Sequence, residues 1–90
     1  SAWLNIGAPN SLSVRCRKPG DYFHPSGMQD RKKLQDFMVD SKIPRAWRNR
    51  IPLLETERGV AWVVGWRIAQ WAIPRPDMLP VKVTFDRTTM

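Results

Sequence analysis

Three consecutive cations, Arg31, Lys32 and Lys33, stand where the sequence predicts the first turn of a helix. The positive end of the helix dipole disfavours each of them by roughly 0.3–1 kcal/mol at a surface. The same position suits an anion, because unpaired backbone N–H groups and basic side chains all attract a phosphate. The placement therefore predicts phosphate binding. The alternative is that the three side chains simply extend into solvent, clear of the helix end.

A second basic group surrounds a shorter helix predicted over residues 44–50, which has a proline in its first turn. Its members are Lys42, Arg45, Arg48 and Arg50. Arg45 and Arg48 are three residues apart and would share a helix face. A planar guanidinium group binds phosphate through two parallel hydrogen bonds. The alternative is pairing with nearby carboxylates, which contributes little stability at a surface. The candidates for such pairing are Asp40, Glu55 and Glu57.

A third basic group belongs to a strand predicted over residues 12–17, in which apolar and polar side chains alternate. Arg15 and Arg17 emerge on one side of this strand. The residues expected to face the core are Leu12, Val14 and Cys16. Lys18 begins a turn at 18–21, where a central Pro-Gly pair favours chain reversal. These cations would extend a basic stripe if this face lies beside the helices.

Few residues have catalytic potential. His24 would suit acid–base catalysis, but no serine or cysteine nucleophile with a matching base is recognisable near it. Asp36 and Asp40 are expected to balance Lys32 and Lys33 rather than bind a metal. One cysteine and one histidine cannot form a structural zinc site, and no nucleotide-binding glycine motif occurs. We therefore expect no catalytic residue, metal or cofactor in this chain; a small enzyme that uses His24 is the alternative.

Five tryptophans in 90 residues are a high proportion. Trp47 is expected to anchor the second helix in the core, and Trp62 and Trp66 to share one buried face of a later strand. Trp3 and Trp71 are less constrained. A tryptophan that stays exposed would stack on an unpaired base or mark a protein interface.

The composition describes one globular domain over residues 1–90, since two cores in so short a chain would each be too small. The net charge of +7 favours a polyanionic partner. A single cysteine excludes an intramolecular disulfide and fits a reducing compartment such as the cytoplasm. The longest apolar stretch, 60–66, is far shorter than the ~20 residues that a membrane span needs.

The order of the predicted elements indicates the fold class. They are a strand at 12–17, helices at 30–39 and 44–50, an extended piece from 53, and strands at 60–66 and 81–86. Asp30 is the expected N-cap of the first helix, and Leu34, Phe37 and Met38 form its apolar stripe. The strand at 60–66 is apolar on both faces and is expected to be central. Because strands and helices are segregated, we predict an α+β domain: a small, mainly antiparallel β-sandwich with two short helices.

Several short motifs, taken together, resemble those of one family. They are Arg-Lys-Pro-Gly-Asp-Tyr-Phe at 17–23, Gly-Met at 27–28, Lys-Lys-Leu-Gln-Asp-Phe at 32–37, Lys-Ile-Pro-Arg at 42–45, Arg at 48, Ile-Pro-Leu-Leu at 51–54 and Val-Val-Gly-Trp-Arg-Ile at 63–68. In order and spacing they resemble the C-terminal domain of bacterial tRNA(Ile)-lysidine synthetase.

The resemblance implies an ATP-dependent ligase that joins lysine to the wobble cytidine of a tRNA(Ile) with a CAU anticodon, with ATP and lysine as substrates of the parent enzyme. The SGGxDS-type ATP loop of the family's N-terminal domain is absent here, so this chain would be a non-catalytic tRNA-docking domain. It would act with the catalytic N-terminal domain of the same protein, near the acceptor stem of the tRNA. The implied fold is similar to part of the phenylalanyl-tRNA synthetase β subunit.

The family's Lys-Lys pair falls on Lys32 and Lys33, and its Lys-Ile-Pro-Arg motif on residues 42–45. Asp30 and Asn49 depart from the family pattern. The predicted RNA-binding residues are Arg17, Lys18, Arg31, Lys32, Lys33, Lys42, Arg45 and Arg48. The alternative function, motivated by the tryptophan content, is a protein-interaction module that docks the catalytic domain or forms a homodimer.

Overall fold

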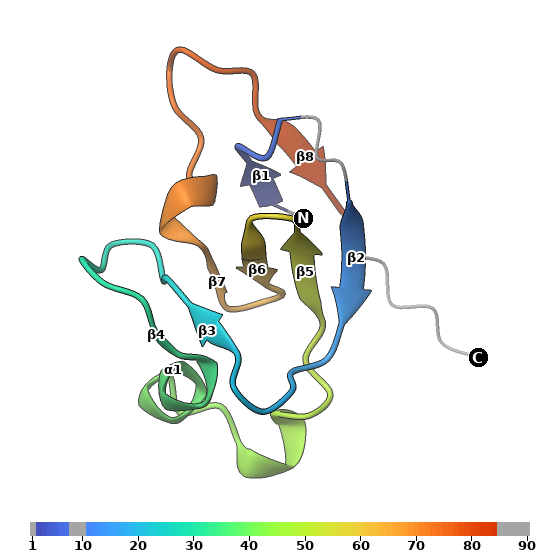
Figure 1. The fold of residues 1–90 in the computed structure, drawn as a ribbon, viewed down its shortest axis with the longest axis vertical. Coiled ribbons are helices and arrows are strands. Elements are labelled where there is room, and N and C mark those ends of the chain that lie inside the picture. The colour runs from blue at the N-terminus through green and yellow to red at the C-terminus, as the bar shows by residue number, and fades with distance from the viewer. Residues whose placement is uncertain (1, 8–10, 85–90) are drawn as a thin grey trace.

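The computed structural model describes residues 2–7 and 11–84, and its largest sheet has four antiparallel strands. In spatial order these are β2 (Leu12–Arg15), β5 (Leu53–Thr56), β6 (Gly59–Val63) and β7 (Arg67–Ile68). Two smaller antiparallel sheets pair β1 (Ala2–Leu4) with β8 (Val81–Val83), and β3 (Tyr22–Phe23) with β4 (Lys32–Lys33). One α-helix and two 3-10 turns make up the remaining regular structure of the described residues (Figure 1). The predicted α+β class with antiparallel sheets is confirmed.

Strand β6 is one of the two inner strands of the large sheet, as its apolar sequence predicts. Val60, Ala61, Trp62 and Val63 are all buried. The strand nevertheless ends at Val63 rather than at Trp66. Gly65 takes a φ of +85°, which an L side chain adopts only with strain, and it turns the chain immediately after β6.

The α-helix, α1 (Leu34–Asp40), buries Leu34, Phe37 and Met38, so its predicted apolar stripe is confirmed. The ring of Phe37 meets that of Phe23 edge-on at 5.0 Å between centroids. The predicted start was wrong. The backbone stays extended through Lys33 because β4 pairs with β3, so Asp30 is not the N-cap.

At its other end α1 closes in a Schellman motif. The N–H of Lys42 donates to the carbonyl of Val39 and that of Ile43 to the carbonyl of Met38, each at 3.0 Å. Ile43 is fully buried. Lys42 takes a φ of +59° in the position that usually holds glycine. A non-glycine residue is strained there.

The second predicted helix is a single 3-10 turn, η1 (Arg45–Trp47). The expectation that Trp47 anchors it in the core was wrong, because Trp47 is 52% exposed. The flanking residues Ile43 and Ile51 are buried and join the core in place of Trp47. So short a turn leaves its own side chains on the surface. A second 3-10 turn, η2 (Gln70–Ala72), buries only Ala72.

The strand predicted at 12–17 ends at Arg15, and the expected direction of its side chains was wrong. Leu12 and Val14 are each 54% exposed and Cys16 is exposed, whereas Arg15 is largely covered. β2 lies at the end of its sheet, and the exposure of Leu12 and Val14 shows that no element among the described residues covers their face of the strand. The turn at 18–21 is confirmed by Gly20, whose φ is +86°. The last predicted strand is β8; Phe85 and Asp86 lie outside the described residues.

Candidate nucleic-acid interface

A shallow hollow is lined by three chain segments, 17–22, 33–35 and Asn49, and gathers cations from the first two. These segments lie at the lower end of the molecule in Figure 1. It holds about 350 Å³, and Arg17, Lys18 and Lys33 contribute to its lining. We call these three residues and the space between them the basic hollow. Arg17 Nε donates to Asn49 Oδ1 at 2.8 Å, which connects the hollow to the segment after η1.

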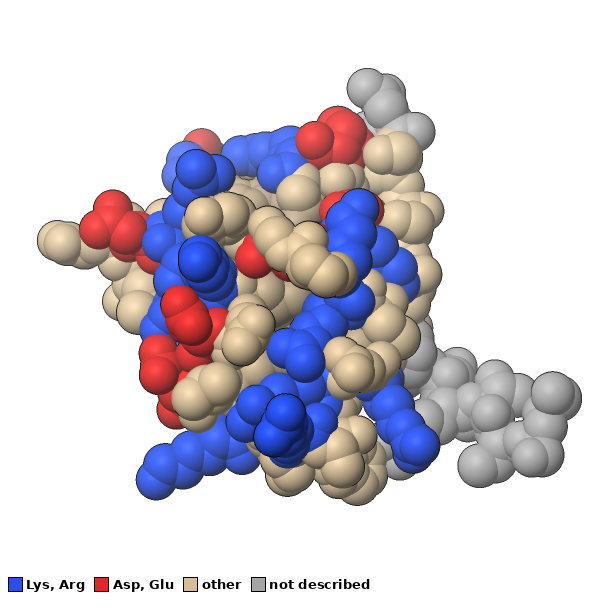
Figure 2. Space-filling view, turned by 60° about the horizontal axis from the view of Figure 1, so that its bottom comes forward, with Lys and Arg blue, Asp and Glu red and all other residues tan. Residues whose placement is uncertain are grey.

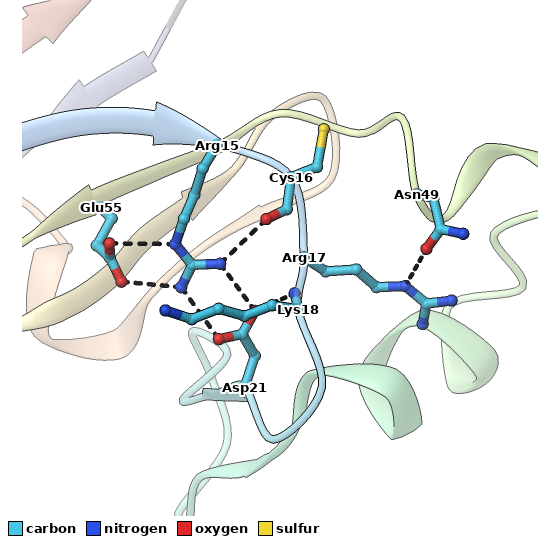
Figure 3. A network of polar contacts seen from close by, with 7 residues as sticks. All are labelled: Arg15, Cys16, Arg17, Lys18, Asp21, Asn49 and Glu55. Atoms are coloured by element: carbon cyan, nitrogen blue, oxygen red, sulfur yellow. Dashed lines mark hydrogen bonds and ion pairs between the residues drawn. The ribbon is translucent and has the colours of Figure 1, made fainter.

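Next to the hollow, Arg15 is held by two carboxylates (Figure 3). Its guanidinium group donates to both oxygens of Asp21, at 2.9 and 3.0 Å, and to both oxygens of Glu55, at 2.8 and 3.1 Å. It also donates to the carbonyl of Cys16 at 3.1 Å. We call Arg15, Asp21 and Glu55 the Arg15 network. Since every donor nitrogen of Arg15 is engaged inside the domain, this arginine is unavailable to a ligand.

The Arg15 network shifts the titration of its members. Hydrogen bonds from Arg15 lower the pKa of Glu55. Partial burial raises the pKa of Asp21, but the hydrogen bonds from Arg15 and from the backbone N–H of Lys18 outweigh it, so the net shift is downward. The pKa of Arg15 rises, because hydrogen bonds to Glu55 and Asp21 favour its charged form. The network carries one surplus negative charge, which the neighbouring Lys18 partly offsets.

The predicted placement of Arg31, Lys32 and Lys33 in the first turn of a helix was wrong, because α1 begins only after Lys33. Because Lys32 and Lys33 are consecutive strand residues, their side chains leave opposite faces of β4. Lys33 reaches the basic hollow, whereas Lys32 forms an ion pair with Asp40. Arg31 stacks over the ring of Tyr22, 4.8 Å from its centroid. The three cations therefore have three separate surroundings, and only Lys33 joins Arg17 and Lys18.

Around η1 the cations remain more open. Arg48 Nε donates to the carbonyl of Ile43 at 3.0 Å, which leaves the other guanidinium nitrogens for a ligand. Lys42 and Arg45 are exposed and form no ion pair with any carboxylate in the described part of the chain. The alternative pairing with Asp40, Glu55 or Glu57 is not among the ion pairs of the described residues. Asp40 and Glu55 instead hold Lys32 and Arg15.

These basic groups share one broad face. Figure 2 views the molecule from the end that carries α1, η1 and the turn at 18–21, and shows Lys and Arg side chains in a band across it. Acidic side chains gather mainly to one side of that band. The arrangement suits an extended polyanion better than a small anion, because the positive charge is spread along a surface rather than concentrated in one cavity.

His24, the alternative catalytic residue, directly follows β3. The ring Nε2 of His24 lies 2.7 Å from the carbonyl oxygen of Met28. Among these residues no group of three or more His, Cys, Asp or Glu side chains is placed to hold a metal ion. None of the helices in this part of the chain has the length and apolar character to cross a membrane.

The sequence interpretation missed a second surface feature, an apolar groove of about 990 Å³ beside the basic face. Its lining is Pro44, Trp47, Arg50, Ile51, Pro52, Val64, Gly65 and Trp66. We call it the tryptophan groove. Both tryptophans were expected in the core. The glycine at 65, immediately before Trp66, was the available signal that the strand ends earlier.

A protein-family model described as the TilS substrate C-terminal domain matches residues 12–77. The chain belongs to this family. The resemblance drawn from the motifs is thereby confirmed, and all eight predicted RNA-binding residues lie within the matched stretch. A solved structure, described as the crystal structure of TILS C-terminal domain, superimposes with a TM-score of 0.65 and 30% sequence identity. The match covers 80% of this chain and 58% of that one.

Curated relatives agree with this family. A tRNA(Ile)-lysidine synthase of Dehalococcoides mccartyi is 51% identical over 72 residues, which cover 79% of this chain and 15% of the relative. The same enzyme of Symbiobacterium thermophilum is 53% identical over 64 residues, which cover 70% of this chain and 13% of the relative. The chain thus spans about 15% or less of the length of these relatives.

Proposed function

We propose that this chain is the tRNA-docking part of a longer cytoplasmic tRNA(Ile)-lysidine synthase and contributes no catalytic residue. The longer protein would join lysine to the wobble cytidine of tRNA(Ile), with ATP and lysine as its substrates and a separate catalytic domain to bind them. The observation that carries the proposal is the basic face, where Arg17, Lys33, Lys42 and Arg45 remain without carboxylate partners among residues 2–7 and 11–84.

The acceptor stem of a tRNA fits such a face because it is an RNA duplex. Duplex RNA of the A form presents phosphates and 2′-hydroxyl groups in a regular array, while its deep groove hides the base edges. A broad surface of Lys and Arg reads this shape rather than a sequence. The Arg17–Asn49 hydrogen bond helps here, because it holds one cation in place before the RNA arrives.

The test is binding of a tRNA(Ile) transcript to the 90-residue chain and to the double variant Arg17→Glu, Lys33→Glu. We expect the variant to bind at least roughly tenfold more weakly and with a shallower salt dependence, because fewer counterions are released. Arg75→Glu is the control, since Arg75 is exposed and belongs to the loop between η2 and β8. That loop lies at the opposite end of the molecule in Figure 1. Unchanged affinity in the double variant would contradict the assigned surface.

A specific observation favours a second candidate, contact with the rest of the longer protein or with a second copy. Leu12 and Val14 are each 54% exposed on β2, at the end of the large sheet. An exposed apolar strand at a sheet end is a ready docking surface. If the surface serves self-association, light scattering should show a dimer that Leu12→Lys converts to a monomer. A concentration-independent monomer would exclude self-association and leave only contact within the longer protein.

A further inference from the structure

The tryptophan groove is flanked by two large aromatic side chains that the fold leaves in water. Trp47 is 52% exposed and Trp66 is 46% exposed. Both belong to tight turns: η1, which follows Pro44, and the turn at Gly65 after β6. Neither indole belongs to the hydrophobic core, which includes the neighbouring residues Ile51 and Val63. Two exposed tryptophans that line the same groove mark a place where a ligand covers them.

The lining of the groove indicates the chemistry of that ligand. Arg50 is its one charged residue, and no carboxylate contributes to it. The ligand should therefore combine a flat apolar face, for stacking against indole rings, with negative charge near Arg50. A nucleotide has both properties, since its base supplies the face and its phosphate the charge.

The groove also continues the basic face. Asn49, which lines the basic hollow and accepts a hydrogen bond from Arg17, is followed directly by Arg50, which lines the groove. An RNA strand that lies on the hollow can therefore pass into the groove without leaving the surface. This continuity favours RNA over a polypeptide as the occupant.

We infer that the tryptophan groove binds unpaired bases of a single-stranded segment that adjoins the duplex held on the basic face. This inference rests on the proposed function and deepens it, because it names the RNA feature that the domain distinguishes: a junction between duplex and single strand. Stacking accepts any base, since every base has a π face. The groove would recognise that bases are unpaired and not their identity.

The experiment compares two RNA hairpins with the same stem, one blunt and one with a short 3′ overhang. The 90-residue chain should bind the overhang hairpin on the order of tenfold more tightly, the scale of one or two stacked bases. Trp47→Leu and Trp66→Leu should each remove most of that preference and leave binding of the blunt hairpin unchanged. Trp47→Phe should keep much of it, because a phenyl ring still stacks. Trp3→Leu is the matched control, as Trp3 is 53% exposed but lies on β1 and outside the groove lining.

The outcomes separate this inference from the proposed function. Equal affinity for the two hairpins, or variants that lose affinity for both in equal measure, overturns the groove assignment while salt-dependent blunt binding still supports RNA docking. A groove that serves a polypeptide would give the first of these results. Loss of all salt-dependent RNA binding would instead overturn the proposed function. Quenching of tryptophan fluorescence by the overhang hairpin but not by the blunt one is the independent readout expected.

Discussion

Arg15 and Arg17 are separated by one residue, yet the fold gives them opposite surroundings. Arg15 is enclosed by Asp21 and Glu55 and is 21% exposed in its side chain. Arg17 turns away from that network and donates a hydrogen bond to the side-chain amide of Asn49, as Figure 3 shows. The first arginine therefore stabilises the domain, and the second remains available to a ligand. Positive charge in a sequence becomes a binding surface only where the fold brings no carboxylate to it.

The largest expected effect is on stability. Arg15→Met leaves Asp21, whose side chain is only 8% exposed, without its cation. A poorly solvated carboxylate that loses its charged hydrogen bonds destabilises a fold by about 2–3 kcal/mol. Arg17→Met should change stability by less than about 0.5 kcal/mol. Urea denaturation of both variants measures the contrast, and equal effects would refute the division of roles.

The next largest effect is expected on RNA affinity, where Arg17 and not Arg15 should matter. Arg17→Met should weaken binding of a tRNA acceptor-stem hairpin by roughly threefold to tenfold and reduce the salt slope by about one. A variant that keeps the charge, Arg17→Lys, should recover part of the loss. The Arg15→Met variant, measured at a temperature where it is fully folded, should bind as the parent chain does. A clear loss of affinity for folded Arg15→Met would place Arg15 in the interface instead.

A smaller effect is expected on the pH dependence of stability. Asp21 and Glu55 have folded-state pKa values below their ordinary values of 3.8 and 4.5. In that range the unfolded chain binds more protons than the folded one, so stability decreases as the pH is lowered. The contribution should be complete above about pH 5.5 and be lost as the pH drops through the lowered values. We expect the denaturation midpoint to decline less steeply between pH 6 and pH 3 in Arg15→Met than in the parent chain. Parallel pH curves for the two proteins would count against the network.

The smallest expected effect concerns Lys42, which belongs with Arg17 to the cations that remain available to a ligand. Its φ of +59° is strained for lysine but not for glycine. Lys42→Gly should therefore raise the free energy of unfolding by about 0.5–1 kcal/mol. If its charge serves RNA, the same variant should bind RNA roughly twofold more weakly. Lys42→Asn is the control, because asparagine also tolerates this backbone conformation and removes the charge without introducing a glycine. A Lys42→Gly variant that is no more stable would show that the strain is small.

Local features were predictable from the residues themselves. The 3.6-residue spacing of Leu34, Phe37 and Met38 identified the buried face of α1. The Pro-Gly pair at 19–20 identified the turn, and the unbroken apolar run from Val60 identified the central strand. These predictions succeeded because each depends on backbone preferences and periodicities within a few residues. The family motifs likewise sufficed to identify the family.

The candidate site was only partly predictable. Arg17, Lys18 and Lys33 were recognised as basic, but the sequence placed Lys33 with Arg31 and Lys32 in one phosphate site. Their separation results from pairing between β3 and β4. The exposure of Trp66 likewise follows from where β6 ends. The residues at 31–33 are compatible with either the start of a helix or a short strand. Which of the two forms depends on whether β3 is available to pair with them.

The amino-acid sequence was sufficient to predict the α+β class, the family, the strong positive charge and the buried stripe of α1. Contacts between segments far apart in the chain determine which cations stabilise the fold and which remain available to a ligand. Arg15 meets Glu55 40 positions away, and Arg17 meets Asn49 32 positions away. The physical reason is the range of the forces involved. Propensity and periodicity act between neighbours in sequence, whereas an ion pair depends on which distant segments the core brings within about 3 Å.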